Sequence, residues 1–569
     1  MIQHCEQSHE APGSVYDRAR DSASQSCNAE VNHIRQFEQF KSTASLKFKD
    51  DCLTIPPLDQ LTTSSSEQQK KNELTAEQKR LWWDVDLIDK NVLKPNDSAQ
   101  FKADMKTFEK RAEEQGLNTE DVAKTYSQVS RILEAKGDRP LAEKDRVRAA
   151  LDIMAIAADP TSNNQGNHNT CNVTALENRI FTRQPDVAAG LIADVATSGK
   201  YTAKDGTTVS LDKESLTVQP DAVEAAKQPR SENHRNYASQ LFQVTAINLL
   251  YERDPQTAGK LHYSQGPERT PGPPGGSDST ADSAGGTESS PTGEKLMKGS
   301  TEIKPSYGGD QNPEYAQKGG TVQDVVDMNT MITGKYEPKA FLQRKDMANA
   351  DETRGNSVGS EAEFDKQLTE LKDSGQLPAV VAVDIANDPF YKINQESNEK
   401  RTEQEKASGS PPRTPPGMPP GRPPLLDMST LQGAGHFVSI TSYDHEKQEL
   451  TYKNQEGSDQ NPQKPVSVHE FYESMTVAKA SDWIDRANNA YDRVQQLHNK
   501  GKLSDKDYRS YLSEYASDLS QIMSHYSQLW ENQQKDVPGT PGTFDQVDKE
   551  RATQKFEQAL KRISPANVE

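Results

Sequence analysis

The sequence predicts an α+β protein that carries long segments without regular structure. Three observations support this prediction. Apolar residues recur at helical spacing through residues 100–260. Runs typical of the strands of a main sheet occur at 378–384, 435–443 and 449–454. Gly, Pro and Ser gather in low-complexity stretches, and only 32% of the chain is hydrophobic, so we expect one moderate core with polar tails and inserts.

Charge and hydropathy exclude several classes of protein. The chain has 569 residues with 67 basic and 86 acidic side chains, a net charge of −19. Such acidity argues against a nucleic-acid binder, because affinity for phosphate comes from clustered Lys and Arg. No run of about 18 apolar residues occurs, and the first residues lack a secretory pattern. We therefore expect a cytoplasmic protein without membrane contact, while non-classical secretion stays open.

The N-terminal half is expected to be helical after a polar beginning. Residues 1–72 are rich in Ser, Gln and Glu, which predicts disorder. Residues 73–263 then form a helical lobe with a hairpin turn at Asp205-Gly206. Helices are predicted over 98–136 (two helices), over 142–158, from near Cys171, from Pro185 and over 233–251.

The C-terminal half alternates between inserts and ordered segments. Residues 264–312 are a low-complexity, disordered insert, and 313–392 contain helices and the first core strand. A Pro-rich insert, 393–424, is followed by a β lobe over 425–478. Residues 479–569 are predicted to be helical, with a hairpin of two antiparallel helices and a final charged helix.

A cysteine at the predicted start of a helix is the first candidate for chemistry. Cys171 follows the polar loop that contains Gln165, in the run QGNHNTC. Free N–H groups and the positive end of the helix dipole stabilise a thiolate there. When the thiolate attacks a carbonyl, the carbonyl oxygen becomes negative near the same N–H groups. Gln165 is positioned to donate a second hydrogen bond to this oxygen.

A histidine and an asparagine on the predicted β-hairpin supply the partners that a thiolate needs. His436 begins one strand in GHFVSI, and Asn454 ends the next in NQEG. In a hairpin the start of one strand lies beside the end of the other, so we expect the two side chains to meet. Histidine titrates near working pH, and a carboxamide oxygen orients its ring.

These motifs resemble those of the papain-like cysteine peptidases, which share Gln-Gly-x-x-x-x-Cys, Gly-His-x-Val and Asn-x-x-Gly in this chain order. The resemblance implies a two-lobed fold, with a helical lobe and a small antiparallel sheet. It also implies that Cys171 is the nucleophile, His436 the base and acid, Asn454 the orienting group and Gln165 part of the oxyanion hole. The substrate is then a protein or peptide, and no cofactor or metal is expected.

Several alternatives remain open. The same triad is compatible with transglutaminase-like acyl transfer, and a non-catalytic interaction protein would keep the fold alone. His168, Cys171 and His436 form a weak zinc pattern. The polyproline run 411–424 resembles ligands of SH3-like domains.

Overall fold

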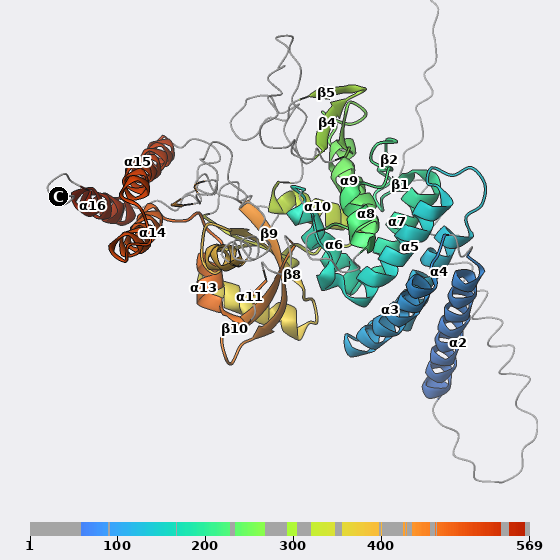
Figure 1. Ribbon diagram of the computed structural model, residues 1–569. Helices are drawn as coiled ribbons and strands as arrows, with labels where there is room; N and C mark the ends of the chain where they lie inside the picture. Colours follow the sequence, from blue (N-terminus) through green and yellow to red (C-terminus); the bar gives the residue numbers. More distant parts are fainter. Residues whose placement is uncertain are drawn as a thin grey trace, which may run out of the picture. The chain divides into compact units, whose positions relative to one another are not determined.

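The computed structural model (Figure 1) describes most of the chain in separate ranges. Of the N-terminal unit, Met1–Gln68, it describes the backbone of 58–68, which is helical. None of the described helices combines the length and apolar content needed to cross a bilayer. The described ranges are 58–88, 92–166, 168–227, 234–267, 293–303, 320–346, 356–397, 400, 425–426, 428, 435–455, 461–462, 464–535 and 546–563.

Helices account for most of the described residues before 375, and their ends follow ordinary capping chemistry. Asn118 accepts a hydrogen bond from the backbone N–H of Glu120 and so begins α4. Thr321 and Asp324 form a capping box on α10. The bounds are α2 (Leu58–Leu87), α3 (Pro95–Glu114), α4 (Thr119–Glu134), α5 (Glu143–Ala158), α6 (Cys171–Arg183), α7 (Pro185–Ser198), α8 (Pro220–Lys227), α9 (Tyr237–Arg253), α10 (Val322–Thr333) and α11 (Glu361–Asp373).

The main sheet has six strands in the order β11-β10-β9-β8-β6-β7. The predicted hairpin is β9 (Gly435–Asp444) with β10 (Glu449–Asn454), and β9 also pairs antiparallel with β8 (Ala379–Asp384). β6, however, runs parallel to both β8 and β7. The remaining strands are β6 (Phe341–Arg344), β7 (Asn356–Val358) and β11 (Val466–Ser467), and the short helix α13 (Val468–Glu473) follows β11.

The expectation of a purely antiparallel sheet is therefore wrong, because the sheet is mixed. β6 and β7 have four and three residues, which is too short for an apolar pattern to stand out from the surrounding sequence. The chain passes from β7 through α11 to β8, which lies on the other side of β6. Such a helical crossover is how parallel strands are joined.

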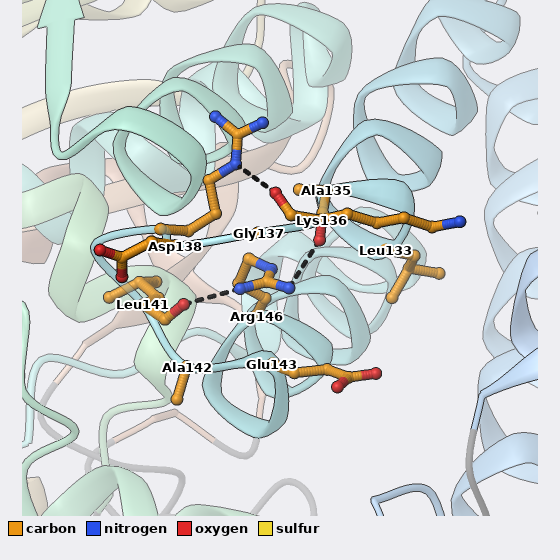
Figure 2. A pocket seen from close by; sticks show the side chains of 10 residues that line it. Leu133, Ala135, Lys136, Gly137, Asp138, Leu141, Ala142, Glu143 and Arg146 are labelled. Carbon is orange, nitrogen blue, oxygen red and sulfur yellow. Dashed lines mark hydrogen bonds between the residues drawn. The ribbon is translucent and has the colours of Figure 1, made fainter.

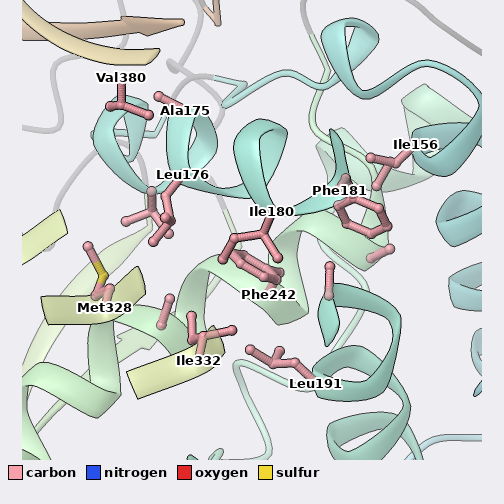
Figure 3. Packing of buried hydrophobic residues seen from close by; sticks show 14 of the residues in the cluster. Ile156, Ala175, Leu176, Ile180, Phe181, Leu191, Phe242, Met328, Ile332 and Val380 are labelled. Atoms are coloured by element: carbon pink, nitrogen blue, oxygen red, sulfur yellow. The ribbon is translucent and has the colours of Figure 1, made fainter. Parts of the chain in front are cut away.

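Helix α6 lies at the centre of the hydrophobic core. Its residues Asn172 to Phe181 are all buried. Figure 3 shows Leu176 and Ile180 directed at Phe242 of α9 and at Met328 and Ile332 of α10. The other side of α6 packs on β8 and β9. The helices and the sheet consequently share one continuous core, and the first residue of α6 lies at its margin.

Two segments expected to be disordered contain regular structure. The insert predicted at 264–312 includes β4 (Glu294–Lys298) and β5 (Thr301–Ile303), which form an antiparallel sheet with β3 (Leu261–Gln265). The helix α2 likewise extends back to Leu58, inside the predicted disordered segment 1–72. Backbone pairing stabilises β4 although its sequence, EKLMK, has little apolar alternation. Residues 268–292 lie outside the described part.

Smaller elements complete the fold. The predicted hairpin at Asp205-Gly206 is β1 (Lys200–Thr202) with β2 (Thr208–Ser210). Residues 390–397 are helical, although 393–424 was expected to be a Pro-rich insert. The polyproline run 411–424 and the thiols Cys5, Cys27 and Cys52 lie outside the described residues.

The C-terminal helices form a bundle with a hydrophobic cluster of their own. In agreement with the prediction, α14 (Ala480–Asn499) and α15 (Asp505–Gln534) are antiparallel, with Tyr491 stacked on Tyr515 at 4.6 Å between ring centres. The third helix, α16 (Gln546–Arg562), packs on α14, and its Arg562 forms an ion pair with Asp492 of α14.

Candidate functional site

Cys171 is the first residue of α6 and is half-buried. The residue before it, Thr170, makes no capping hydrogen bond, and its hydroxyl donates instead to the Gln243 side chain at 2.8 Å. The side-chain oxygen of Asn172 accepts the N–H of Val173 in the first turn at 2.8 Å, whereas no described side chain is hydrogen-bonded to the N–H of Cys171. This is the arrangement that stabilises negative charge on a sulfur or on a nearby oxygen.

His436 and Asn454 meet across the β9–β10 hairpin. The Nε2 atom of His436 lies 2.8 Å from the Oδ1 atom of Asn454, and both side chains are buried. Because a carboxamide oxygen only accepts, Nε2 carries the proton in this contact. The other ring nitrogen, Nδ1, is then the one suited to exchanging a proton with a thiol.

Helix α6 packs on β8 and on β9, the strand that contains His436 near its start. Near the other end of α6, Arg179 donates to the backbone oxygen of Pro378, one residue before β8, at 2.6 Å. From Arg179 back to Cys171 the helix rises about 12 Å, and β8 advances about 13 Å from Ala379 to Val383. Val383, toward the other end of β8, is paired with His436. Among the described residues, no hydrogen bond joins the Cys171 thiol to an imidazole.

Gln165 lies on the loop that precedes α6, and this loop contacts the hairpin. Its backbone N–H donates to the backbone oxygen of Gln455, the residue after Asn454, at 3.0 Å. Its side chain is buried, and the side-chain oxygen has no hydrogen-bond partner in the described part of the chain. The structure thus brings Gln165 to the hairpin that holds the histidine and the asparagine.

Gly166 adopts a conformation that a side chain would disturb. Its φ is +66°, and an added Cβ would lie 3.1 Å from a carboxylate oxygen of Asp221 and 3.3 Å from Cβ of Arg235. The Gln-Gly pair in the sequence therefore has a structural cause. Glycine lets the backbone approach α8 closely while Gln165 turns toward the hairpin.

A buried network fixes the second half of the loop. The imidazole of His168 contacts Asp221 through Nε2 at 3.1 Å and Gln265 through Nδ1. Burial by itself would raise the pKa of Asp221, but the charge of Arg235 and the hydrogen bond from His168 hold it below its usual value. Both ring nitrogens of His168 are thus engaged, which argues against the zinc alternative. The described residues contain no group of three or more His, Cys, Asp or Glu side chains arranged to hold a metal.

No protein-family model matches this chain, and no curated protein or solved structure matches it. The chemistry of the site therefore rests on its own residues and their geometry.

A second buried network, which the sequence did not reveal, lies under the loop. The carboxylate of Glu177, on α6, accepts hydrogen bonds from Ser239 at 2.8 Å and from Gln243 at 3.2 Å. Ser239 also contacts the side-chain oxygen of Asn163, at the beginning of the loop. Complete burial raises the pKa of Glu177 to about 7, and these hydrogen bonds oppose the rise. A glutamate between Leu176 and Asn178 on a core helix was the only available signal.

The three-stranded sheet reaches the same loop from another direction. Both carboxylate oxygens of Glu294, on β4, lie 3.2 Å from the backbone nitrogen of Asn169, two residues before Cys171. The hydroxyl of Tyr263 donates to Glu294 at 2.8 Å. A segment expected to be disordered thus contributes a contact to the loop before Cys171.

A cavity of about 390 Å³ lies elsewhere, between the end of α4 and the start of α5. Figure 2 shows Arg146 within it, donating to the backbone oxygens of Leu141 and Ala135. Neither Cys171 nor His436 lines this cavity. Its central arginine satisfies the carbonyl groups of a turn, which is a structural role.

Proposed function

We propose that this chain is a papain-like cysteine peptidase that hydrolyses protein or peptide substrates. In this proposal Cys171 is the nucleophile, His436 the general base and acid, and Asn454 the group that orients the imidazole. The observation that carries it is the 2.8 Å contact between His436 Nε2 and Asn454 Oδ1, on a hairpin that is hydrogen-bonded through Gln455 to Gln165 in the loop before α6.

The proton moves from the Cys171 thiol to Nδ1 of His436, and the thiolate attacks the substrate carbonyl carbon. The carbonyl oxygen gains negative charge beside the N–H of Cys171 and the side-chain amide of Gln165. The imidazolium then protonates the leaving nitrogen as the C–N bond breaks, leaving a thioester. Water attacks this thioester, its proton passes to His436, and the acid and the thiol are released.

The two-lobed papain-like fold belongs to the same proposal. One lobe consists of the helices from α3 to α9, and the other contains the β9–β10 hairpin. The position of α6 supports this division, because this helix packs on α9 on one side and on β8 and β9 on the other. The nucleophile would then lie at the boundary of the two lobes, within reach of groups from both.

Turnover of a pool of fluorogenic peptides tests the proposal. Cys171→Ala and His436→Ala should each abolish cleavage. His445→Ala is the matched control, since His445 lies exposed in the turn of the same hairpin, and it should leave the rate unchanged. Cleavage that survives in Cys171→Ala would overturn the proposal.

An added primary amine separates hydrolysis from acyl transfer. A peptidase yields the free acid as its main product, whatever the amine concentration. Products dominated by the new amide would instead favour the transglutaminase-like alternative on the same triad.

A further inference from the structure

We propose that Gln455 is a positioning residue that holds the Gln165 loop against the His436 hairpin. The inference rests on the proposed function and adds a residue to it. Gln455 directly follows Asn454 in the chain and is completely buried. It makes one contact through its backbone and another through its side chain.

The backbone contact joins two parts of the site that are far apart in the sequence. The carbonyl oxygen of Gln455 accepts the N–H of Gln165 at 3.0 Å. The side chain of Asn454, the preceding residue, accepts a hydrogen bond from Nε2 of His436. Only the φ and ψ of Gln455 separate the planar peptide unit that follows Asn454 from the one whose oxygen accepts Gln165, so a displacement of Gln455 would move Gln165 relative to the imidazole.

The side-chain contact sets the position of Gln455 itself. Its Nε2 atom donates to the hydroxyl of Ser439 at 3.0 Å, and Ser439 is completely buried in β9, three residues after His436. The pairing of β10 with β9 ends at Asn454, which lies opposite Val438. The hydrogen bond from Gln455 to Ser439 therefore holds one further residue against the hairpin. It also orients the Gln455 carbonyl toward the loop that contains Gln165.

The turn that contains Gln165 has hydrogen bonds of its own, but these bonds do not connect it to the β9–β10 hairpin. The side chain of Asn163 accepts the N–H of Asn164 at 3.1 Å, and the side chain of Asn164 accepts the N–H of Gly166 at 2.7 Å. These bonds shape the turn locally. The bond to Gln455 sets where the turn lies relative to His436.

Ser439→Ala and Gln455→Met remove the side-chain contact without adding bulk. Ser442→Ala is the matched control, an exposed serine on the same strand. A neutral hydrogen bond of this kind corresponds to roughly a fivefold to tenfold effect. We expect kcat for peptide hydrolysis to fall by that factor in both variants while KM is retained. Alkylation of Cys171 by iodoacetamide should remain near the wild-type rate, since it needs no oxyanion hole.

Hydrogen exchange makes the inference testable apart from catalysis. The peptide that contains Gln165 should exchange about fivefold to tenfold faster in Ser439→Ala and Gln455→Met, and at the wild-type rate in Ser442→Ala. Unchanged exchange in both variants would overturn the role of Gln455. An inactive wild-type protein would contradict the proposed function, while the exchange result would still decide whether Gln455 holds the loop.

Discussion

Replacing Gly166 by alanine is expected to reduce both stability and turnover. The residue has a φ of +66°, a conformation that costs an L-residue about 1–2 kcal/mol. The new Cβ would also lie 3.1 Å from an oxygen of Asp221 and 3.4 Å from the backbone nitrogen of Arg235. The backbone of Arg235 and the hydrogen-bonded carboxylate of Asp221 have little freedom to move away from the new Cβ. The steric contact therefore adds about 1–2 kcal/mol to the loss of stability. The expected loss in the free energy of unfolding is about 2–4 kcal/mol.

Gly116→Ala provides the matched control for this change. Gly116 has a φ of +65°, but no atom lies within 4 Å of its added Cβ. It shares the backbone cost of Gly166 without the crowding, so it should lose only about 1–2 kcal/mol and keep full turnover. Urea denaturation measures the stability of both variants, and peptide cleavage measures activity. Equal stability and equal turnover in the two variants would refute the account of the Gln165 loop.

Three further outcomes follow from the described contacts. Asn454→Ala removes the acceptor of His436 and should lower kcat/KM roughly tenfold, given about 1–1.5 kcal/mol for the bond, whereas an unchanged value would deny Asn454 its orienting role. The raised pKa of Glu177, about 7, means that the folded state holds a proton that the unfolded state releases above about pH 4.5. Stability should therefore fall by up to about 3 kcal/mol as pH rises from 5 to 8, and Glu177→Gln should flatten this fall in denaturation curves. Burial, with a smaller effect of Glu514, likewise raises the pKa of Asp518 in α15 to about 7, so Asp518→Asn should raise the Tm at pH 8, and a lowered Tm would contradict this reasoning.

The sequence predicted those parts of the site that depend on local structure. The start of a helix at Cys171 follows from a polar loop ahead of apolar residues at helical spacing. The pairing of His436 with Asn454 follows from hairpin geometry, since the two residues lie 18 positions apart. Neither inference needs knowledge of the rest of the fold.

The contacts that fix the loop before Cys171 could not be predicted, because they join distant parts of the chain. Ser239 lies 62 residues from Glu177 in the sequence, and Gln265 lies 97 residues from His168. Polar residues such as these have no periodic pattern, and only the fold shows that they are buried together. The bond from Gln165 to Gln455 is between backbone atoms, which leave no trace in residue types.

The mixed sheet and the β3–β4–β5 sheet show the same limit at the level of the fold. Strands of three to five residues gain their stability from pairing with neighbours and not from their own composition. β8 was predictable because its residues, Ala379–Asp384, are mostly β-branched or small. In the structure all of them are buried. β7 has three residues and no such pattern.

The rate at which Cys171 is alkylated tests the central claim most directly. Intact protein is treated with iodoacetamide at pH 6, and mass spectrometry scores Cys171 against Cys5, Cys27 and Cys52. The account predicts that Cys171 reacts at least tenfold faster than the other three thiols and that His436→Ala abolishes this difference. A Cys171 that reacts no faster than the others, or whose rate is the same in His436→Ala, would contradict the pairing of this thiol with the imidazole.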